Sequence, residues 1–140
     1  PERYEAGTLN LPGVAGLWRG AEHVRENLSR IMMSEREVAS QLYAELRKMH
    51  GVEIYSPDDE AARAGIVSFN LGDLSSSEAA DALARRNIAV RGGLHCAPGA
   101  HRFLGTLRRG AVRASVGHAT TSADIDALLS AVAEILKKGE

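Results

Sequence analysis

Apolar residues recur at helical spacing over much of the N-terminal third of the chain. A first helix is predicted to begin at Pro12. Its apolar positions on one face are Val14, Leu17, Trp18, Ala21 and Val24. A second helix is predicted from Ser34, because Ser34 and Glu37 have the spacing of a capping box. Gly51 is a typical C-terminal stop for that helix.

Helical spacing returns in two later segments. Ser75 and Glu78 repeat the capping-box spacing and predict a short helix that ends at about Arg86. A last helix is predicted over residues 122–137, where the apolar positions again share one face. Residues 97–110 contain three glycines and one proline and are predicted to be irregular.

Alternating and short apolar runs predict the strands. They fall at 52–55, 66–71, 88–90 and 111–116. Residues 1–10 are polar and read as an extended arm or loop. Short strands between helices favour an α+β fold, in which a small, largely antiparallel sheet is covered by helices. We expect a single domain over residues 1–140.

Composition and charge exclude several classes of function. The chain has 140 residues, 44% of them hydrophobic, and a net charge of −1, so we expect neither a nucleic-acid nor a membrane partner. The five histidines are dispersed, so no metal site is expected. A single cysteine excludes an intrachain disulfide and fits the reducing cytoplasm.

That cysteine lies in the segment Arg-Gly-Gly-Leu-His-Cys-Ala-Pro, residues 91–98. A free cysteine is most often a buried apolar residue. Here the glycines and the proline indicate a loop, and nearby positive charge favours the thiolate, which is the nucleophilic form. We therefore favour an exposed, functional thiol at Cys96 over a core residue.

Three polar, glycine-bearing segments carry a family resemblance. They are Arg3-Tyr-Glu-Ala-Gly-Thr-Leu-Asn10, Arg91-Gly-Gly-Leu-His-Cys-Ala-Pro98 and Val112-Arg-Ala-Ser-Val-Gly117. In this order and spacing they resemble the C-terminal domain of class V aminotransferase-type enzymes, closest to the cysteine desulfurase and selenocysteine lyase branch of the SUF type. The resemblance implies the small C-terminal domain of a fold-type I pyridoxal phosphate enzyme, with the large cofactor-binding domain absent from this chain.

The resemblance also implies roles for individual residues. Cys96 lies at the sulfur-accepting nucleophile, which takes sulfur from a cysteine substrate as a persulfide and releases alanine. Selenocysteine is the other substrate that the resemblance leaves open. Arg113 matches the arginine that binds the substrate carboxylate, which suits a planar guanidinium. Gly7 and Thr8 match the arm that reaches the pyridoxal phosphate of the partner subunit in a homodimer. A sulfur-acceptor protein is a further possible partner.

Arg91 and His95 flank the thiol and are candidates for favouring the thiolate or orienting the substrate. Each assignment has a plainer alternative. His95 is equally consistent with a loop residue bonded to backbone, Arg113 with a surface arginine, and Gly7 and Thr8 with a turn before a helix.

The sequence departs from the family at two places. After Arg113 the aromatic residue and the asparagine of the family are missing from His118-Ala-Thr-Thr121, although Thr121 is kept. The Schiff-base lysine is not in this chain, whose lysines are only Lys48, Lys137 and Lys138. Two other functions stay open: an aminotransferase or lyase of the same fold in which Cys96 is incidental, and a free-standing, non-catalytic binding or scaffold module.

Overall fold

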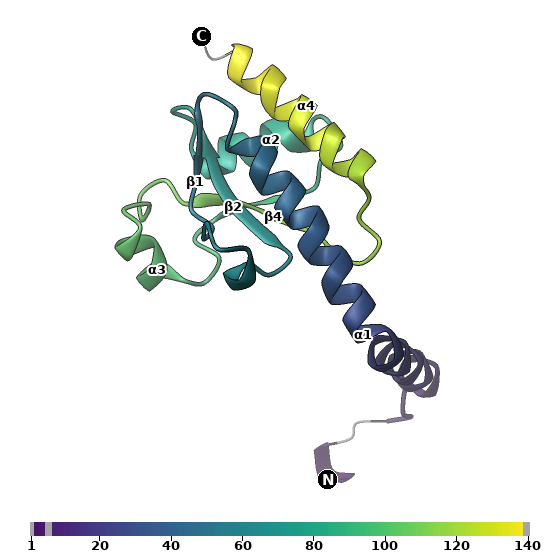
Figure 1. The fold of residues 1–140 in the computed structure, drawn as a ribbon. Coiled ribbons are helices and arrows are strands. Elements are labelled where there is room, and N and C mark those ends of the chain that lie inside the picture. The colour runs from purple at the N-terminus through teal and green to yellow at the C-terminus, as the bar shows by residue number, and fades with distance from the viewer. Residues whose placement is uncertain (1, 5–6, 139–140) are drawn as a thin grey trace.

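The sheet has four antiparallel strands in the order β1-β2-β4-β3. The computed structural model describes residues 2–4 and 7–138. The strands are β1 (Val52–Ile54), β2 (Ile66–Leu71), β3 (Arg91–Gly93) and β4 (Ala111–Ser115). The long helices are α1 (Leu11–Leu46), α2 (Ser76–Ala84) and α4 (Ser122–Lys138), as Figure 1 shows. The predicted α+β class and antiparallel sheet are confirmed.

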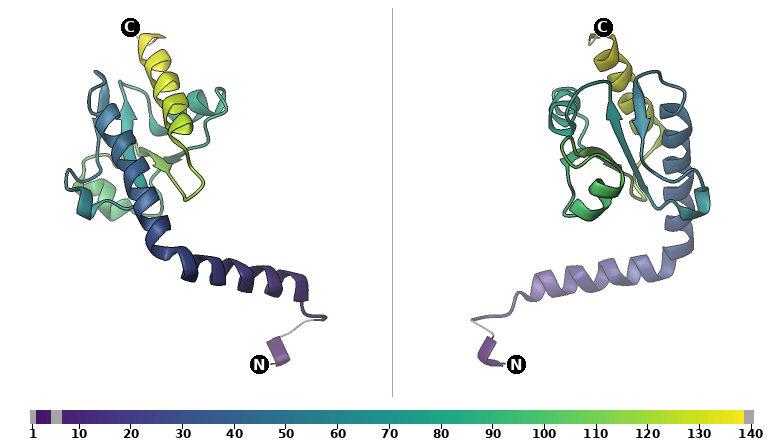
Figure 2. Two further views of the ribbon diagram at one scale, coloured as in Figure 1. Left: turned by 45° about the vertical axis from the view of Figure 1, so that its right-hand side comes forward. Right: turned by 90° about the vertical axis from the view of Figure 1, so that its left-hand side faces the viewer.

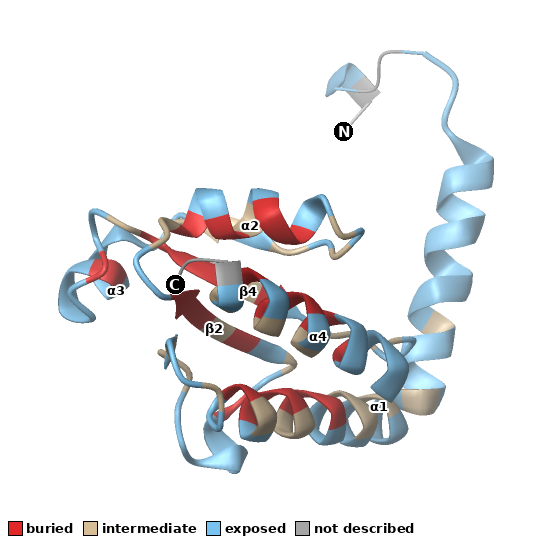
Figure 3. Cartoon of the chain, turned by 90° about the horizontal axis from the view of Figure 1, so that it is seen from above, coloured by how far each residue is buried: buried red, intermediate tan, exposed pale blue. Residues whose placement is uncertain are grey.

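One face of the sheet carries the core. Val67, Phe69 and Leu71 of β2 alternate onto this face, and Val112 of β4 pairs with Phe69 beside them. All four side chains are fully buried. The C-terminal part of α1, together with α2 and α4, packs against them (Figure 3). The opposite face is left without helical cover from α1, α2 or α4, and it carries the even-numbered positions of β2 and the odd-numbered positions of β4.

The prediction of two separate helices at the N-terminus is wrong. Residues 11–46 form one continuous helix, which Asn10 caps by accepting a hydrogen bond from the Gly13 N–H at 3.0 Å. Ser34 lies inside that helix. The two methionines before it are good helix formers, and no glycine or proline lies between residues 21 and 46. The helix does change direction along its length, as Figure 2 shows.

The N-terminal half of α1 buries almost nothing. Its predicted apolar face is exposed, and the side chain of Trp18 keeps 68% of its accessible surface. A helix of this kind owes its stability mainly to packing of its apolar face. The exposed stripe comprises Leu11, Val14, Leu17, Trp18, Val24 and Leu28.

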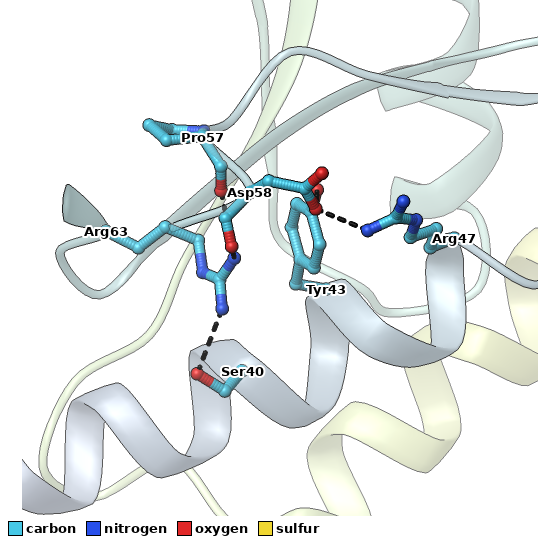
Figure 4. A network of polar contacts seen from close by, with 6 residues as sticks. All are labelled: Ser40, Tyr43, Arg47, Pro57, Asp58 and Arg63. Atoms are coloured by element: carbon cyan, nitrogen blue, oxygen red, sulfur yellow. Dashed lines mark hydrogen bonds and ion pairs between the residues drawn. The ribbon is translucent and has the colours of Figure 1, made fainter. Parts of the chain in front are cut away.

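A polar cluster holds the loop after β1 against the C-terminal end of α1 (Figure 4). The Arg63 guanidinium lies over the Tyr43 ring and donates to the carbonyls of Pro57 and Asp58 at 2.9 and 2.8 Å. Tyr43 in turn donates to the Asp58 carboxylate at 2.7 Å, and this acceptor raises the pKa of the Tyr43 phenol, with burial adding to the effect. The cluster is structural, because it lies on α1, away from β3 and β4.

Two local predictions around the third strand are corrected. The strand is Arg91–Gly93, not 88–90, because these three residues pair with β4, whereas Ile88 and Val90 pack against the core without pairing. The segment predicted to be irregular contains the short helix α3 (Pro98–Phe103). Proline is well placed at the first turn of a helix, where its missing N–H costs nothing.

Candidate functional site

The segment Leu94–Ala97 forms a tight turn that presents the thiol. His95 and Cys96 both have positive φ, at 50° and 57°, and the Ala97 N–H donates to the Leu94 carbonyl at 2.8 Å. These are the features of a type I′ turn, which normally takes asparagine and glycine at its centre. Cys96 is exposed at the second central position, so the predicted exposure of the thiol is confirmed.

The turn costs conformational energy and needs support. Left-handed backbone costs roughly 1–2 kcal/mol for each non-glycine residue. The support comes from His95, whose Nε2 lies 2.9 Å from the Ala111 carbonyl at the start of β4. Since a carbonyl only accepts, Nε2 carries the proton, and in the neutral ring Nδ1 is an acceptor. Nδ1 is buried and has no partner among the described residues. His95 therefore does bond to backbone, as the plainer alternative held, and it leaves one ring nitrogen beside the thiol segment.

Gly92 lets the cysteine segment approach the start of α2. A Cβ at this position would lie 2.3 Å from the Ser76 carbonyl oxygen, which no side chain allows. Ser76 also donates to the Arg109 carbonyl through its N–H at 3.1 Å and its hydroxyl at 2.8 Å. The N-terminus of α2 thus anchors both ends of the connection between β3 and β4.

Arg113 lies on the sheet face opposite the core. Its strand neighbours Val112 and Ala114 are buried on the core face. Arg113 itself is half-buried, with a buried Nε that has no acceptor among the described residues. In the register of β3 and β4 it stands opposite Arg91, which is exposed. Neither arginine forms an ion pair within the described part of the chain. Two unpaired guanidinium groups on one face can bind a carboxylate or another anion.

The structure brings four of the predicted site residues together and leaves two apart. Arg91, His95, Cys96 and Arg113 belong to β3, β4 and the turn between them. Gly7 and Thr8 are exposed. The segment before α1, to which they belong, lies far from α3 in Figures 1 and 2. Gly7 has a φ of 111°, which favours glycine.

The sequence analysis did not identify two residues that stabilise the segment between the cysteine turn and β4. His101 of α3 is buried, and its Nδ1 lies 2.8 Å from the Thr106 hydroxyl. Arg109 donates from Nε to the Leu74 carbonyl at 2.7 Å, tying the segment after α3 to the start of α2. Neither contact could be predicted, because the glycines of residues 97–110 are typical of a loop whose side chains have no fixed partners.

A cavity lies outside this site. It has a volume of about 590 Å³ and separates residues 86–90 from residues 114–120 and the first turns of α4, and none of the predicted site residues lines it.

Among the described residues no group of three or more histidine, cysteine or acidic side chains is placed to hold a metal ion. No helix in the described part of the chain is long and apolar enough to cross a membrane.

Comparison with known proteins agrees with this geometry. Residues 1–128 match the family described as aminotransferase class-V. The chain belongs to that family, whose members of this kind depend on pyridoxal phosphate. A probable cysteine desulfurase of Staphylococcus epidermidis is 35% identical over 134 residues, which is 94% of this chain and 32% of that protein. The chain therefore spans about a third of the length of the curated relatives it matches.

Solved structures show the same similarity. The apo cysteine desulfurase of Thermococcus onnurineus superposes with a TM-score of 0.86 at 33% identity, covering 99% of this chain and 34% of that chain. The cysteine desulfurase CsdA of Escherichia coli, in its S-sulfonic acid form, gives a TM-score of 0.80 at 30% identity, covering 96% and 32%.

Proposed function

We propose that this chain is the small C-terminal domain of a pyridoxal phosphate-dependent cysteine desulfurase. The observation that carries the proposal is the exposed Cys96 thiol on a strained turn, fixed by His95 to the strand that bears Arg113. A thiol that is exposed and held in place by its neighbours suits a nucleophile better than a core residue. The similarity to cysteine desulfurases over nearly the whole chain supports the same conclusion.

Each site residue has a separate role in the proposed reaction. Arg113 binds the substrate carboxylate with its planar fork, and Arg91 adds positive charge from the neighbouring strand. The Cys96 thiolate attacks the substrate Sγ: the new S–S bond forms, the Cβ–Sγ bond breaks, and its electron pair stays with carbon. Protonation of that carbon completes alanine and leaves a persulfide on Cys96. His95 holds the turn in place through the hydrogen bond from its Nε2 to the Ala111 carbonyl.

The chain's residues fit part of the cofactor site. Pyridoxal phosphate, when bound, supplies the electron sink that makes this carbon chemistry accessible. Arg113, whose Nε has no partner among the described residues, would hold the carboxylate of a cofactor-bound substrate on the uncovered face of the sheet. The lysines of this chain are Lys48, Lys137 and Lys138, and none lies on β3, β4 or the cysteine turn. The Schiff-base lysine therefore belongs to the remaining two-thirds of the enzyme.

The protein works as a homodimer in this proposal. The segment that carries Gly7 and Thr8 lies far from α3 in Figures 1 and 2, which supports a contact of these residues with the cofactor phosphate in the partner subunit's site. The persulfide sulfur passes to an acceptor protein in the cytoplasm for iron–sulfur cluster assembly, and the substrate is cysteine or selenocysteine. These assignments rest on the family resemblance.

The test compares variants of the polypeptide that contains this chain together with its cofactor-binding portion. Cys96→Ala is expected to abolish alanine and sulfide release from cysteine while the cofactor absorbance stays unchanged, because the thiol makes no phosphate contact. Leu94→Ala, on the same turn, is the matched control and keeps activity. Near-normal turnover by Cys96→Ala would favour a lyase or aminotransferase in which the thiol is incidental.

A further inference from the structure

Asn70 is a buried amide in the middle of the sheet, on the face opposite the core. It is 1% exposed. Its Nδ2 donates to the Gly110 carbonyl at 2.9 Å and to the Tyr55 hydroxyl at 3.1 Å, so both of its N–H groups are used. Its Oδ1 is also buried, and it has no donor among the described residues. A buried acceptor without a donor costs stability, so such a group in a strand calls for an explanation.

A complementary donor lies on the same face of the sheet. Ser68 pairs directly with Arg113, and Asn70 follows Ser68 by two residues, so Asn70 and Arg113 are diagonal neighbours across β2 and β4. Diagonal positions on one face lie within reach of long side chains. The Nε of Arg113 is a buried donor with no acceptor among the described residues, and the Oδ1 of Asn70 is a buried acceptor with no donor.

Asn70 also takes part in fixing the backbone that leads into Arg113. Three consecutive carbonyls precede or begin β4, and each accepts from a different element. Ser76 of α2 donates to the Arg109 carbonyl, Asn70 of β2 to the Gly110 carbonyl, and His95 of the cysteine turn to the Ala111 carbonyl. The second and third of these bonds link Asn70 through β4 to the turn that carries the thiol.

We propose that Asn70 is a positioning residue for Arg113. Its Oδ1 and Arg113 Nε, neither of which has a partner among the described residues, bond to each other after a rotation of the Arg113 side chain that leaves both Nη groups for the substrate carboxylate, and its Nδ2 holds the start of β4. A guanidinium that binds a carboxylate end-on has Nε left over, and an acceptor there fixes the plane of the fork. The assignment of the carboxylate rests on the proposed function, whereas the contact between Asn70 and Arg113 does not.

The contact is tested in this chain alone by the ¹⁵N–¹H resonance of Arg113 Nε. A slowly exchanging Nε–H is expected in the unmodified chain and in Asn70→Asp, which keeps the acceptor. It is lost in Asn70→Ala and in Asn70→Ser, which are too short to reach Arg113. Tyr55→Phe removes the other side-chain partner of Asn70 and is the matched control, in which the resonance persists. An Nε–H that exchanges equally fast in all these chains would overturn the proposal, as would one unaffected by Asn70→Ser.

Kinetics of the longer polypeptide separate this proposal from the function on which it rests. Asn70→Ser is expected to raise KM for cysteine about tenfold with little change in kcat, the effect of losing one hydrogen bond to a charged group. Asn70→Asp raises KM further, because its carboxylate competes for Arg113. Tyr55→Phe leaves KM unchanged. If Arg113→Lys raises KM but the Asn70 variants do not, Asn70 has no positioning role. If Arg113→Lys itself has no effect, the proposed function fails while the Nε–H result still stands or falls on its own.

Discussion

Arg91 and Arg113 face each other directly across the pairing of β3 with β4. Like charges in directly opposed positions of a sheet are destabilising, and no carboxylate in the described part of the chain pairs with either of them. The arrangement becomes favourable when an anion lies between or above the two guanidinium groups. This pair of arginines is therefore suited to the carboxylate of the proposed substrate.

Replacing Arg113 by lysine keeps the charge and removes the two-pronged contact. Hydrogen bonds to charged groups are typically worth about 2–3 kcal/mol, and this converts to roughly a 30–150-fold drop in kcat/KM for cysteine. Steady-state kinetics in the longer polypeptide, beside a cofactor titration, measure it. Arg102→Lys, on exposed α3, is the control. A loss of less than about threefold would identify Arg113 as a surface residue.

Gly92→Ala is expected to destabilise the fold, because the added Cβ would lie 2.3 Å from the Ser76 carbonyl oxygen. Overpacking of this kind typically costs about 1–3 kcal/mol, which denaturant unfolding resolves as a lower midpoint. Gly99→Ala is the matched control, since its Cβ would meet nothing within 4 Å. Equal midpoints for Gly92→Ala and the unmodified chain would show that Gly92 is not in tight steric contact with the start of α2.

Stability is expected to fall on acidification through the capping carboxylates. The Ser75 hydroxyl and N–H donate to Glu78 at 2.6 and 2.8 Å, and they hold the pKa of this carboxyl below its usual range. The N–H and hydroxyl of Thr121 lower the pKa of Asp124 in the same way. A carboxyl whose pKa is lower in the folded state stabilises the fold above its unfolded pKa of about 4. That contribution is lost as the pH falls through the folded pKa.

Ser75→Ala removes the hydroxyl that contributes most to the shift at Glu78. The unfolding free energy of this variant is therefore less dependent on pH below about 5 than that of the unmodified chain. Denaturant titrations at a series of pH values measure the difference. The control is Ser77→Ala, two residues after Ser75, at a position that is exposed. Parallel pH profiles for Ser75→Ala and the unmodified chain would contradict the assignment.

The chain by itself is expected not to bind pyridoxal phosphate covalently. Lys48 is paired with Glu45 at the end of α1, and Lys137 is exposed on α4, so neither lies beside Arg113. Borohydride reduction after incubation with the cofactor, followed by peptide mapping, is the measurement. A single lysine labelled in stoichiometric amount would show that this chain holds its own Schiff-base site and that the proposed division of the enzyme is wrong.

The spacing of apolar residues predicted which side of the central strand faces the core, and it predicted the helices whose apolar residues share one face. The strand Ile66–Leu71 and the helix at Ser122 lie where the pattern places them. The pattern also predicted helix around Ser34 correctly, but the capping-box spacing there gave a false boundary. Capping residues are compatible with a helix interior when their neighbours favour helix, and tertiary structure decides between the two.

The exposed cysteine and the arginine on the opposite face from the core were also predictable. The residues that hold Cys96 and Arg113 in place could not be predicted, because each of them acts through a contact between segments far apart in the sequence. Nothing near Asn70 in sequence indicates that its amide reaches the Gly110 carbonyl, and nothing near Gly92 indicates that Ser76 lies against it. The third strand was misplaced for a similar reason. Its glycines have low strand propensity, and only pairing with β4 makes them a strand.

Cys96 carries the transferred sulfur in the proposed reaction. The most direct test incubates the cofactor-loaded polypeptide with cysteine, alkylates it without reductant, and measures the mass of the peptide that contains Cys96. We expect a Cys96 peptide heavier than the alkylated thiol by one sulfur atom, formed only with substrate and lost in Arg113→Lys at low cysteine concentration. An unmodified Cys96 peptide during active turnover would contradict it.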